Sequence, residues 1–211
     1  METAFQPPIV ILANGRFPTH PNPLTILDSA GTVICTDGSA DTLLKFHRTP
    51  HVIIGDLDST KLKKHEFKGL WIPVPDQHKT DLQKTLEWCL INALNDVVIL
   101  GAMGKREDHS MGNLHLLAEF SQKMNIHFIT DYSCIYYLKN KRSFSSSKGQ
   151  LISIVALEPI NSISTKGLKY PLNQEPLPPE CNGISNEAEG NEFTIDTSGP
   201  IWLFINHMND S

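Results

Sequence analysis

Four acidic segments recur in the first half of the chain, each placed where a predicted strand ends. They lie at 37–41 (DGSAD), 56–58 (DLD), 79–81 (KTD) and 106–109 (REDH). Carboxylates repel a polyphosphate unless hard cations intervene, and Mg²⁺ takes oxygen ligands from one or two carboxylates plus the phosphates of a substrate. The pattern therefore predicts a metal-phosphate site, to which Lys79, Lys105 and Arg106 would add positive charge.

Short, β-branched runs that end in Gly or Asp predict the strands that position these segments. The runs are 9–13, 32–36, 51–54, 97–100 and 126–130. Amphipathic stretches alternate with them, and two helical faces are expected, made of Leu82, Leu86, Leu90 and Ala93 and of Leu114, Leu117, Ala118 and Ser121. Strands alternating with helices indicate an open parallel α/β sheet, in which ligands bind beyond the carboxyl ends of the strands. The acidic segments should converge there.

Composition restricts the class of protein. With 211 residues, 40% hydrophobic residues and a net charge of −5, the chain is expected to be globular and not to bind nucleic acid. The start lacks the basic and apolar regions of a signal peptide, and no apolar run approaches the roughly 20 residues of a membrane span, so a cytoplasmic location is the default. The cysteines form no C-x-x-C pair and are expected to be reduced, partly buried thiols: Cys35, Cys89, Cys134 and Cys181.

The pattern changes near Asp131. After Ser133 no helical period is evident, and the runs 151–157, 193–196 and 201–205 indicate strands between clusters of Gly, Pro, Asn and Ser. A second, all-β domain is therefore expected over 132–211, after an α/β domain over 1–131. Within it, the Ser-rich segment 143–149 is predicted to be a loop, and 172–179 carries too many prolines for a central strand.

Taken in order, the segments resemble the thiamin pyrophosphokinase family. TDGSAD at 36–41 is similar to the family's A-D-G-G-A-N, GDLDS at 55–59 to G-D-F-D-S, and KTD at 79–81 to D-x-T-D. GKREDH at 104–109, with Asn113, is similar to G-G-R-x-D-H-x-x-x-N, and GLKYPL at 167–172, GISNE at 183–187 and Trp202 follow in the family's order. Seven segments in register across nearly the whole chain are a specific match. Ser39, Asp41 and Lys105 depart from it, standing where the family usually has Gly, Asn and Gly.

The resemblance implies an N-terminal Rossmann-like parallel sheet with flanking helices, which binds nucleotide and metal, and a C-terminal β-sandwich, which binds thiamin and forms a homodimer. It implies that the hydroxyl of thiamin attacks the β-phosphorus of ATP, with Mg²⁺ present and AMP leaving. The family places its active site at the subunit interface, between the N-terminal domain of one subunit and the β-domain of another.

Residue roles follow from the matching positions. The expected metal ligands are Asp37, Asp56, Asp58 and Asp81. The expected ATP-binding residues are Asp37, Gly38, Asp56, Lys79, Thr80, Asp81, Arg106 and His109. The expected thiamin-binding residues are Asp108, Asn113, Ser185, Asn186 and Trp202. The residues expected to act in catalysis are Asp56, Asp58, Asp81, Arg106 and Asp108.

Several of these residues also have a purely structural interpretation. Asp37 and Asp58 could cap helices that follow them, and Arg106 and Asp108 could form a surface ion pair. Others could serve only as local hydrogen-bonding, turn or core residues: His109, Asn113, Ser185, Asn186 and Trp202.

Some segments also resemble those of other protein classes. VIIGDLDST at 52–60 resembles the D-x-D-x-T strand of haloacid-dehalogenase phosphatases, but earlier strands precede it and no later G-D-x-x-x-D follows. A P-loop kinase is excluded because Gly104-Lys105 lacks the upstream Gly and the following Ser or Thr. A thiamin or nucleotide sensor without turnover, and pyrophosphoryl transfer to a pterin-like alcohol, remain open.

Overall fold

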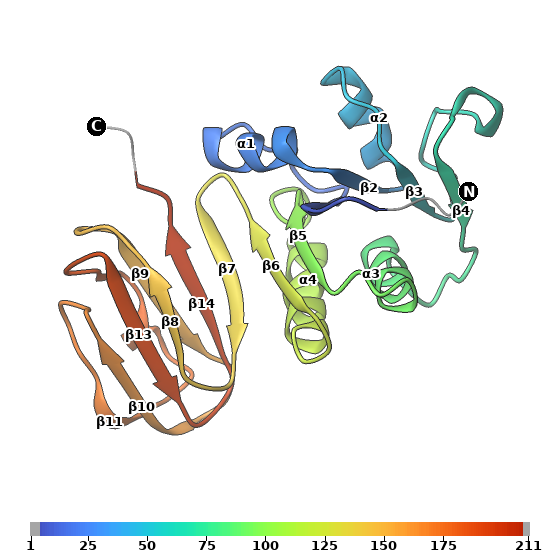
Figure 1. The fold of residues 1–211 in the computed structure, drawn as a ribbon. Coiled ribbons are helices and arrows are strands. Elements are labelled where there is room, and N and C mark those ends of the chain that lie inside the picture. Colours follow the sequence, from blue (N-terminus) through green and yellow to red (C-terminus); the bar gives the residue numbers. More distant parts are fainter. Residues whose placement is uncertain (1–4, 209–211) are drawn as a thin grey trace. The chain divides into compact units, whose positions relative to one another are not determined.

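The computed structural model describes residues 5–208. The chain divides between Asp131 and Tyr132 into two compact units, which are described in turn (Figure 1). The first unit is a parallel sheet with helices on both faces, and the second is a pair of antiparallel sheets. The predicted fold class is confirmed.

The sheet of the first unit contains β1 (Ile9–Leu12), β2 (Thr32–Thr36), β3 (Val52–Gly55), β4 (Leu70–Pro73), β5 (Asp96–Leu100) and β6 (Asn125–Ile129). Their order is β6-β5-β1-β2-β3-β4, and every pairing is parallel. The chain builds outward from β1 to β4 and then returns to the other side of β1 with β5. β1 and β5 therefore flank the topological switch point, where open α/β sheets bind ligands.

Helices α1 (Pro21–Ser29) and α2 (Ser39–Lys45) cover one face of this sheet, and α3 (Asp81–Ile91) and α4 (Glu107–Phe120) cover the other (Figure 1). A short 3-10 helix spans Lys64–Glu66. All residues of β1, β2 and β3 are buried, as expected for central parallel strands.

The predicted face of α3 needs correction at its end. Leu82 and Leu86 are buried, but Leu90 is only half-buried and Ala93 is exposed. The helix ends at Ile91 because Ala93 adopts a left-handed conformation with φ of 57°. On α4 the predicted face is essentially correct, with Leu114 and Leu117 buried.

Two four-stranded antiparallel sheets make up the second unit. One has the order β12 (Asn186–Glu187), β9 (Leu151–Ala156), β14 (Ile201–Asn206), β7 (Ser133–Leu138). The other has the order β11 (Asn173–Leu177), β10 (Ile160–Lys166), β13 (Glu192–Thr197), β8 (Arg142–Ser145), and a 3-10 helix spans Cys181–Gly183. Their inner faces share one hydrophobic core, to which Ile154, Leu203 and Phe193 contribute. This arrangement is a β-sandwich.

Of two sequence predictions for the second unit, the Ser-rich loop is wrong and the exclusion of the proline-containing segment from a central strand is confirmed. Residues 143–145 are not a loop but belong to β8, where Phe144 is buried between exposed Ser143 and Ser145 and pairs with Phe193 of β13. Side chains of this strand alternate between inward and outward positions in the ordinary way, but the serines at the outward positions made the segment resemble a loop. The proline-containing segment forms β11 at the edge of its sheet, so its exclusion from a central position is confirmed.

Cys35, Cys89 and Cys134 are free thiols, and burial raises the pKa of the first two to about 12 and of Cys134 to about 11. The side chain of Cys181 lies outside the described part of the structure. Within residues 5–208, no helix is long and apolar enough to cross a membrane.

Candidate active site

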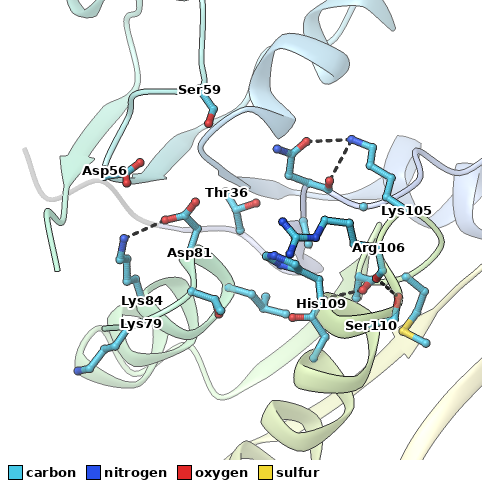
Figure 2. A pocket seen from close by; sticks show the side chains of 18 of the residues that line it. Thr36, Asp56, Ser59, Lys79, Asp81, Lys84, Lys105, Arg106, His109 and Ser110 are labelled. Atoms are coloured by element: carbon cyan, nitrogen blue, oxygen red, sulfur yellow. Dashed lines mark hydrogen bonds and ion pairs between the residues drawn. The ribbon is translucent and has the colours of Figure 1, made fainter. Parts of the chain in front are cut away.

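A cavity of about 590 Å³ opens beyond the carboxyl ends of β1, β2, β3 and β5 (Figure 2). This volume lies within the usual range for small-molecule sites. Its polar walls come from the end of β2, four loops and the first two turns of α3 and α4, and include Asn14, Thr36, Asp56, Ser59, Gln77, His78, Lys79, Thr80, Asp81, Lys84, Lys105, Arg106, His109, Ser110 and Asn113. Three of the four acidic segments, 56–58, 79–81 and 106–109, thus contribute residues to this cavity.

At the switch point itself, the loops after β1 and β5 run in direct contact. The Gly15 N–H donates to the Gly101 carbonyl at 2.7 Å, and a Cβ on Gly15 would lie 2.2 Å from that oxygen. The ammonium of Lys105 donates to the backbone carbonyl of Asn14 at 3.0 Å and to its side-chain oxygen at 3.2 Å. A lysine at this position therefore joins the two loops and brings positive charge to the cavity rim.

Asp37, Asp56 and Asp58 form a carboxylate cluster, each offering an oxygen within 4.8 Å of the others. Asp37 is buried, and its two oxygens accept the N–H groups of Ser59 and Thr60, both at 3.0 Å. Burial raises the pKa of Asp37, and the negative charge of Asp81 adds to this increase. The cluster is thus a set of hard oxygen donors carrying excess negative charge, which is the donor chemistry that Mg²⁺ requires.

The helix-cap interpretation of Asp37 and Asp58 is wrong. Asp37 binds the loop that follows β3, and no side-chain hydrogen bond caps α2. No helix begins directly after Asp58, since the next one starts at Lys64. Both carboxylates instead belong to the cluster.

Asp81, the first residue of α3, approaches this cluster from the opposite face of the sheet. Gly55 leaves room for it, because a Cβ there would lie 2.8 Å from the Cβ of Asp37 and 3.2 Å from Oδ1 of Asp81. The same oxygen accepts a hydrogen bond from buried Lys84 at 3.0 Å. A side-chain hydrogen bond from Gln77 is the main cause that lowers the pKa of Asp56, and Lys84 contributes.

The structure gives local roles to two departures from the family pattern. Ser39 is the first residue of α2, and its hydroxyl donates to the Leu12 carbonyl at 2.6 Å, so a helical conformation and a buried contact replace the glycine turn. Asp41 accepts hydrogen bonds from the Thr60 hydroxyl at 2.9 Å and the Lys61 N–H at 2.8 Å. Asp37 and Asp41 together hold the loop 59–61.

Arg106 and Asp108 form the surface ion pair that was one of the two interpretations. The Nε of Arg106 lies 3.0 Å from Oδ1 of Asp108, and both side chains are largely exposed. Arg106 lines the cavity, whereas Asp108 accepts the N–H of His109 in the first turn of α4. The hydrogen bond from Arg106 lowers the pKa of Asp108 to about 2.

The cavity brings together about half of the residues predicted for the site. Those that line it are Asp56, Lys79, Thr80, Asp81, Arg106, His109 and Asn113. The predicted residues of the first unit that do not line it are Asp37, Gly38, Asp58 and Asp108. Most of these side chains also have local partners; for example, Lys79 pairs with Glu87 at 2.8 Å and Asn113 donates to the Ala102 carbonyl at 2.6 Å.

Sequence reasoning assigned no role to seven polar residues of the wall: Asn14, Thr36, Ser59, Gln77, His78, Lys84 and Ser110. Gln77 and His78 directly precede the K-T-D segment, so extending that segment by two residues would have found them. Lys84 stands three residues after Asp81, a spacing that places both on one side of a helix.

The candidate thiamin residues of the second unit have structural roles there. Asn186 is buried, its Oδ1 accepts the Tyr170 N–H at 3.1 Å, and its Nδ2 donates to the Tyr170 carbonyl at 2.8 Å. Ser185 has a φ of 61° and donates its N–H to the Ser153 hydroxyl. Trp202 lies in β14 and is 9% exposed. These contacts are compatible with a ligand role as well as with a structural one.

Comparisons with known proteins identify the family. Residues 24–129 match the model for the thiamin pyrophosphokinase catalytic domain, and residues 136–202 match that for the thiamin pyrophosphokinase vitamin B1 binding domain. Thiamin pyrophosphokinase 1 of Caenorhabditis elegans is 29% identical over 190 residues, which cover 82% of this chain and 77% of that protein. The crystal structure of thiamine pyrophosphokinase from Bacillus subtilis is 25% identical with a TM-score of 0.80, covering 95% of this chain and 99% of that one. Thiamin pyrophosphokinase from Candida albicans shares the fold at 18% identity, with a TM-score of 0.79 and coverage of 94% and 89%. The chain belongs to the thiamin pyrophosphokinase family.

Proposed function

We propose that the chain transfers the pyrophosphoryl group of ATP to the hydroxyl of thiamin, giving thiamin diphosphate and AMP. The thiamin oxygen forms a bond to the β-phosphorus, the bond from that phosphorus to the α,β-bridging oxygen breaks, and the hydroxyl proton is released. The observation that carries the proposal is the cavity at the switch point, which has carboxylates on one wall and the cationic side chains of Arg106 and Lys105 on another. Pyrophosphoryl transfer requires mainly positioning and charge neutralisation, and this wall arrangement suits both.

Asp37, Asp56, Asp58 and Asp81 are proposed to hold Mg²⁺. When bound, Mg²⁺ would neutralise the phosphate oxygens on which charge develops. The support is the donor set itself, with three carboxylates that can share one ion and a fourth, Asp81, beside them. Gly38 has a steric role in the same region, because a Cβ there would lie 2.9 Å from the Asn14 side chain.

Arg106 is proposed to bind the triphosphate, since a guanidinium can donate two parallel hydrogen bonds to phosphate oxygens. Lys105 at the rim of the cavity would add a point charge. Lys79 would add a second positive charge once its ion pair with Glu87 is broken. Thr80 caps α3 through its hydroxyl, so its backbone and that of Asp81 present the positive end of the helix to the anion. His109 lies at the corresponding end of α4.

Asp108 is proposed to orient the thiamin hydroxyl. A carboxylate with a pKa of about 2 is a poor base while it pairs with Arg106. A phosphate that recruits Arg106 would remove the main cause of that low pKa and free Asp108 to accept a hydrogen bond from the hydroxyl. Nucleotide binding would thereby prepare the residue that positions the second substrate, and Asn113 would complete this part of the site.

The remainder of the proposal rests on the family resemblance. Ser185, Asn186 and Trp202 would bind thiamin, with the Trp202 ring facing the thiazolium cation. The enzyme would act in the cytoplasm as a homodimer whose active sites combine the catalytic domain of one subunit with the β-domain of the other. Mixing inactive Asp81→Asn and Trp202→Ala proteins tests this, because half the dimers would be mixed and each would hold one intact site, restoring about a quarter of wild-type activity. No recovery after subunit exchange would contradict shared sites.

The reaction itself is tested by incubating the protein with ATP, Mg²⁺ and thiamin and separating the products by chromatography. Thiamin diphosphate and AMP in equal amounts are expected. Ligand-induced thermal stabilisation without product would indicate a sensor instead. A pterin-like alcohol offered in place of thiamin should give no product, and preferential turnover of that alcohol would overturn the substrate assignment.

A further inference from the structure

Lys84 is an unusual residue for the buried face of an amphipathic helix. Its side chain is only 2% exposed, yet it carries an ammonium group at the wall of the cavity. An isolated buried charge is costly, so buried lysines are either paired or lose their proton. The Nζ of Lys84 lies 3.0 Å from Oδ1 of Asp81, which supplies that partner.

Further carboxylates lie near the ion pair of Lys84 and Asp81, so this region carries more negative charge than the Lys84 ammonium group can neutralise. Figure 2 shows the Lys84 ammonium joined to Asp81 on the side of the cavity where Asp56 lies. Lys84 lowers the pKa of Asp56, whereas Asp81 raises that of Asp37. One fixed cation therefore acts on carboxylates from two different segments, and one of these, Asp81, in turn affects Asp37.

We propose that Lys84 is a positioning residue that serves as a built-in counterion, holding Asp81 in place and keeping the carboxylates together before Mg²⁺ and the polyphosphate arrive. This inference rests on the proposed function, because it assigns Lys84 to the same metal-phosphate site. Lys84 does not contact the reacting atoms in this account. It acts through Asp81, which lines the cavity.

A purely structural role for Lys84 predicts a different result. If Lys84 only fastens α3 to the sheet, its removal lowers stability equally with and without Mg²⁺. If it offsets carboxylate repulsion, its removal lowers stability mainly without metal, and Mg²⁺ takes over its role. The metal dependence of unfolding separates the two.

The experiment follows thermal unfolding of the full chain in chelator and over a series of Mg²⁺ concentrations, with no nucleotide or thiamin. Lys84→Met should unfold at a lower temperature in chelator and regain most of that loss in Mg²⁺, with the Mg²⁺ midpoint about tenfold lower than in the wild type because a repelling charge is gone. Lys123→Met is the control, since Lys123, three residues after the end of α4, forms an exposed ion pair with Glu119 at 2.8 Å. It should leave the Mg²⁺ midpoint unchanged.

The double variant Asp81→Asn with Lys84→Met keeps the test decisive if Lys84→Met does not fold. Removing both charges leaves neither unpaired, so this variant should be more stable in chelator than Lys84→Met alone. An equal loss with and without Mg²⁺, no Mg²⁺ response in any variant, or a double variant no more stable than the single one would overturn the proposal. Because no substrate is present, absence of thiamin diphosphate formation by the wild type would reject the proposed function separately.

Discussion

Replacing Gly55 with alanine is expected to push apart two carboxylates of the proposed site. The new Cβ would lie 2.8 Å from the Cβ of Asp37, closer than such carbon atoms approach, and 3.2 Å from Oδ1 of Asp81. The Asp37 contact cannot be relieved by a rotamer change, because a Cβ atom is fixed to its backbone. Either β3 or the turn that carries Asp37 must shift.

The size of the effect follows from these contacts. Overpacking a filled position costs about 1–3 kcal/mol. For a chain of 211 residues this corresponds to a fall in Tm of about 2–4 °C per kcal/mol. A displacement of catalytic groups by on the order of 1 Å can reduce turnover about 100-fold. We therefore expect Gly55→Ala to be folded, moderately less stable and nearly inactive.

The assay combines thermal unfolding with the rate of thiamin diphosphate formation at saturating ATP and Mg²⁺. Gly190→Ala is the matched control, because a Cβ on Gly190 would meet no atom within 4 Å, and it should change neither quantity appreciably. A Gly55→Ala protein as active as the wild type would refute the reasoning that these carboxylates must keep their present separation.

Three further predictions concern the loops around the cavity. Arg106→Met should lower kcat about 100-fold or more, measured by steady-state kinetics, because a donor aimed at developing charge is lost. In the wild type, Asp108 should titrate by NMR with a pKa of about 2, and in Arg106→Met its pKa should rise towards the ordinary 3.9 or so. Because the folded pKa is depressed, the stability this carboxylate adds is present above its unfolded pKa and is lost as pH falls through about 2. Asp41→Ala should destabilise the protein by about 1–2 kcal/mol in chemical denaturation, and Asp41→Asn by about half as much, because the amide keeps one acceptor for the loop.

Each of these has a result that would count against it. Unchanged kcat in Arg106→Met would remove the guanidinium from the mechanism, and Arg106→Lys separates charge from geometry. An ordinary pKa for Asp108 in the wild type would mean that the ion pair is absent in solution. Equal stability of Asp41→Ala and the wild type would show that loop 59–61 is held by Asp37 alone.

Much of the sheet could be predicted from the sequence, because buried parallel strands are continuous apolar runs. The ranges expected for β1, β2, β3, β5 and β6 agree with the structure to within a residue or so at each end. In the first unit β4 was not predicted, and β7 is one of several strands of the second unit that were not predicted. β4 is half-buried and ends in Pro73, and β7 mixes Ser133 and Cys134 with aromatic residues, so neither shows a clean period.

The site was predictable to the extent that it depends on strand ends. Asp56, Asp81 and Arg106 reach one cavity because parallel strands end at the same edge of the sheet. Contacts between segments distant in sequence could not be predicted in the same way. The binding of Ser59 by Asp37 and the burial of Lys84 depend on how closely α2, α3 and the loop after β3 approach one another, which no local pattern encodes.

The most direct test of the central claim is to follow the γ-phosphate. With ATP labelled at the γ-phosphorus, Mg²⁺ and thiamin, intact pyrophosphoryl transfer places all the transferred label in thiamin diphosphate, with one unlabelled AMP formed for each molecule of product. Labelled thiamin monophosphate accompanied by ADP would show stepwise phosphoryl transfer and contradict the account, as would labelled free phosphate with unmodified thiamin.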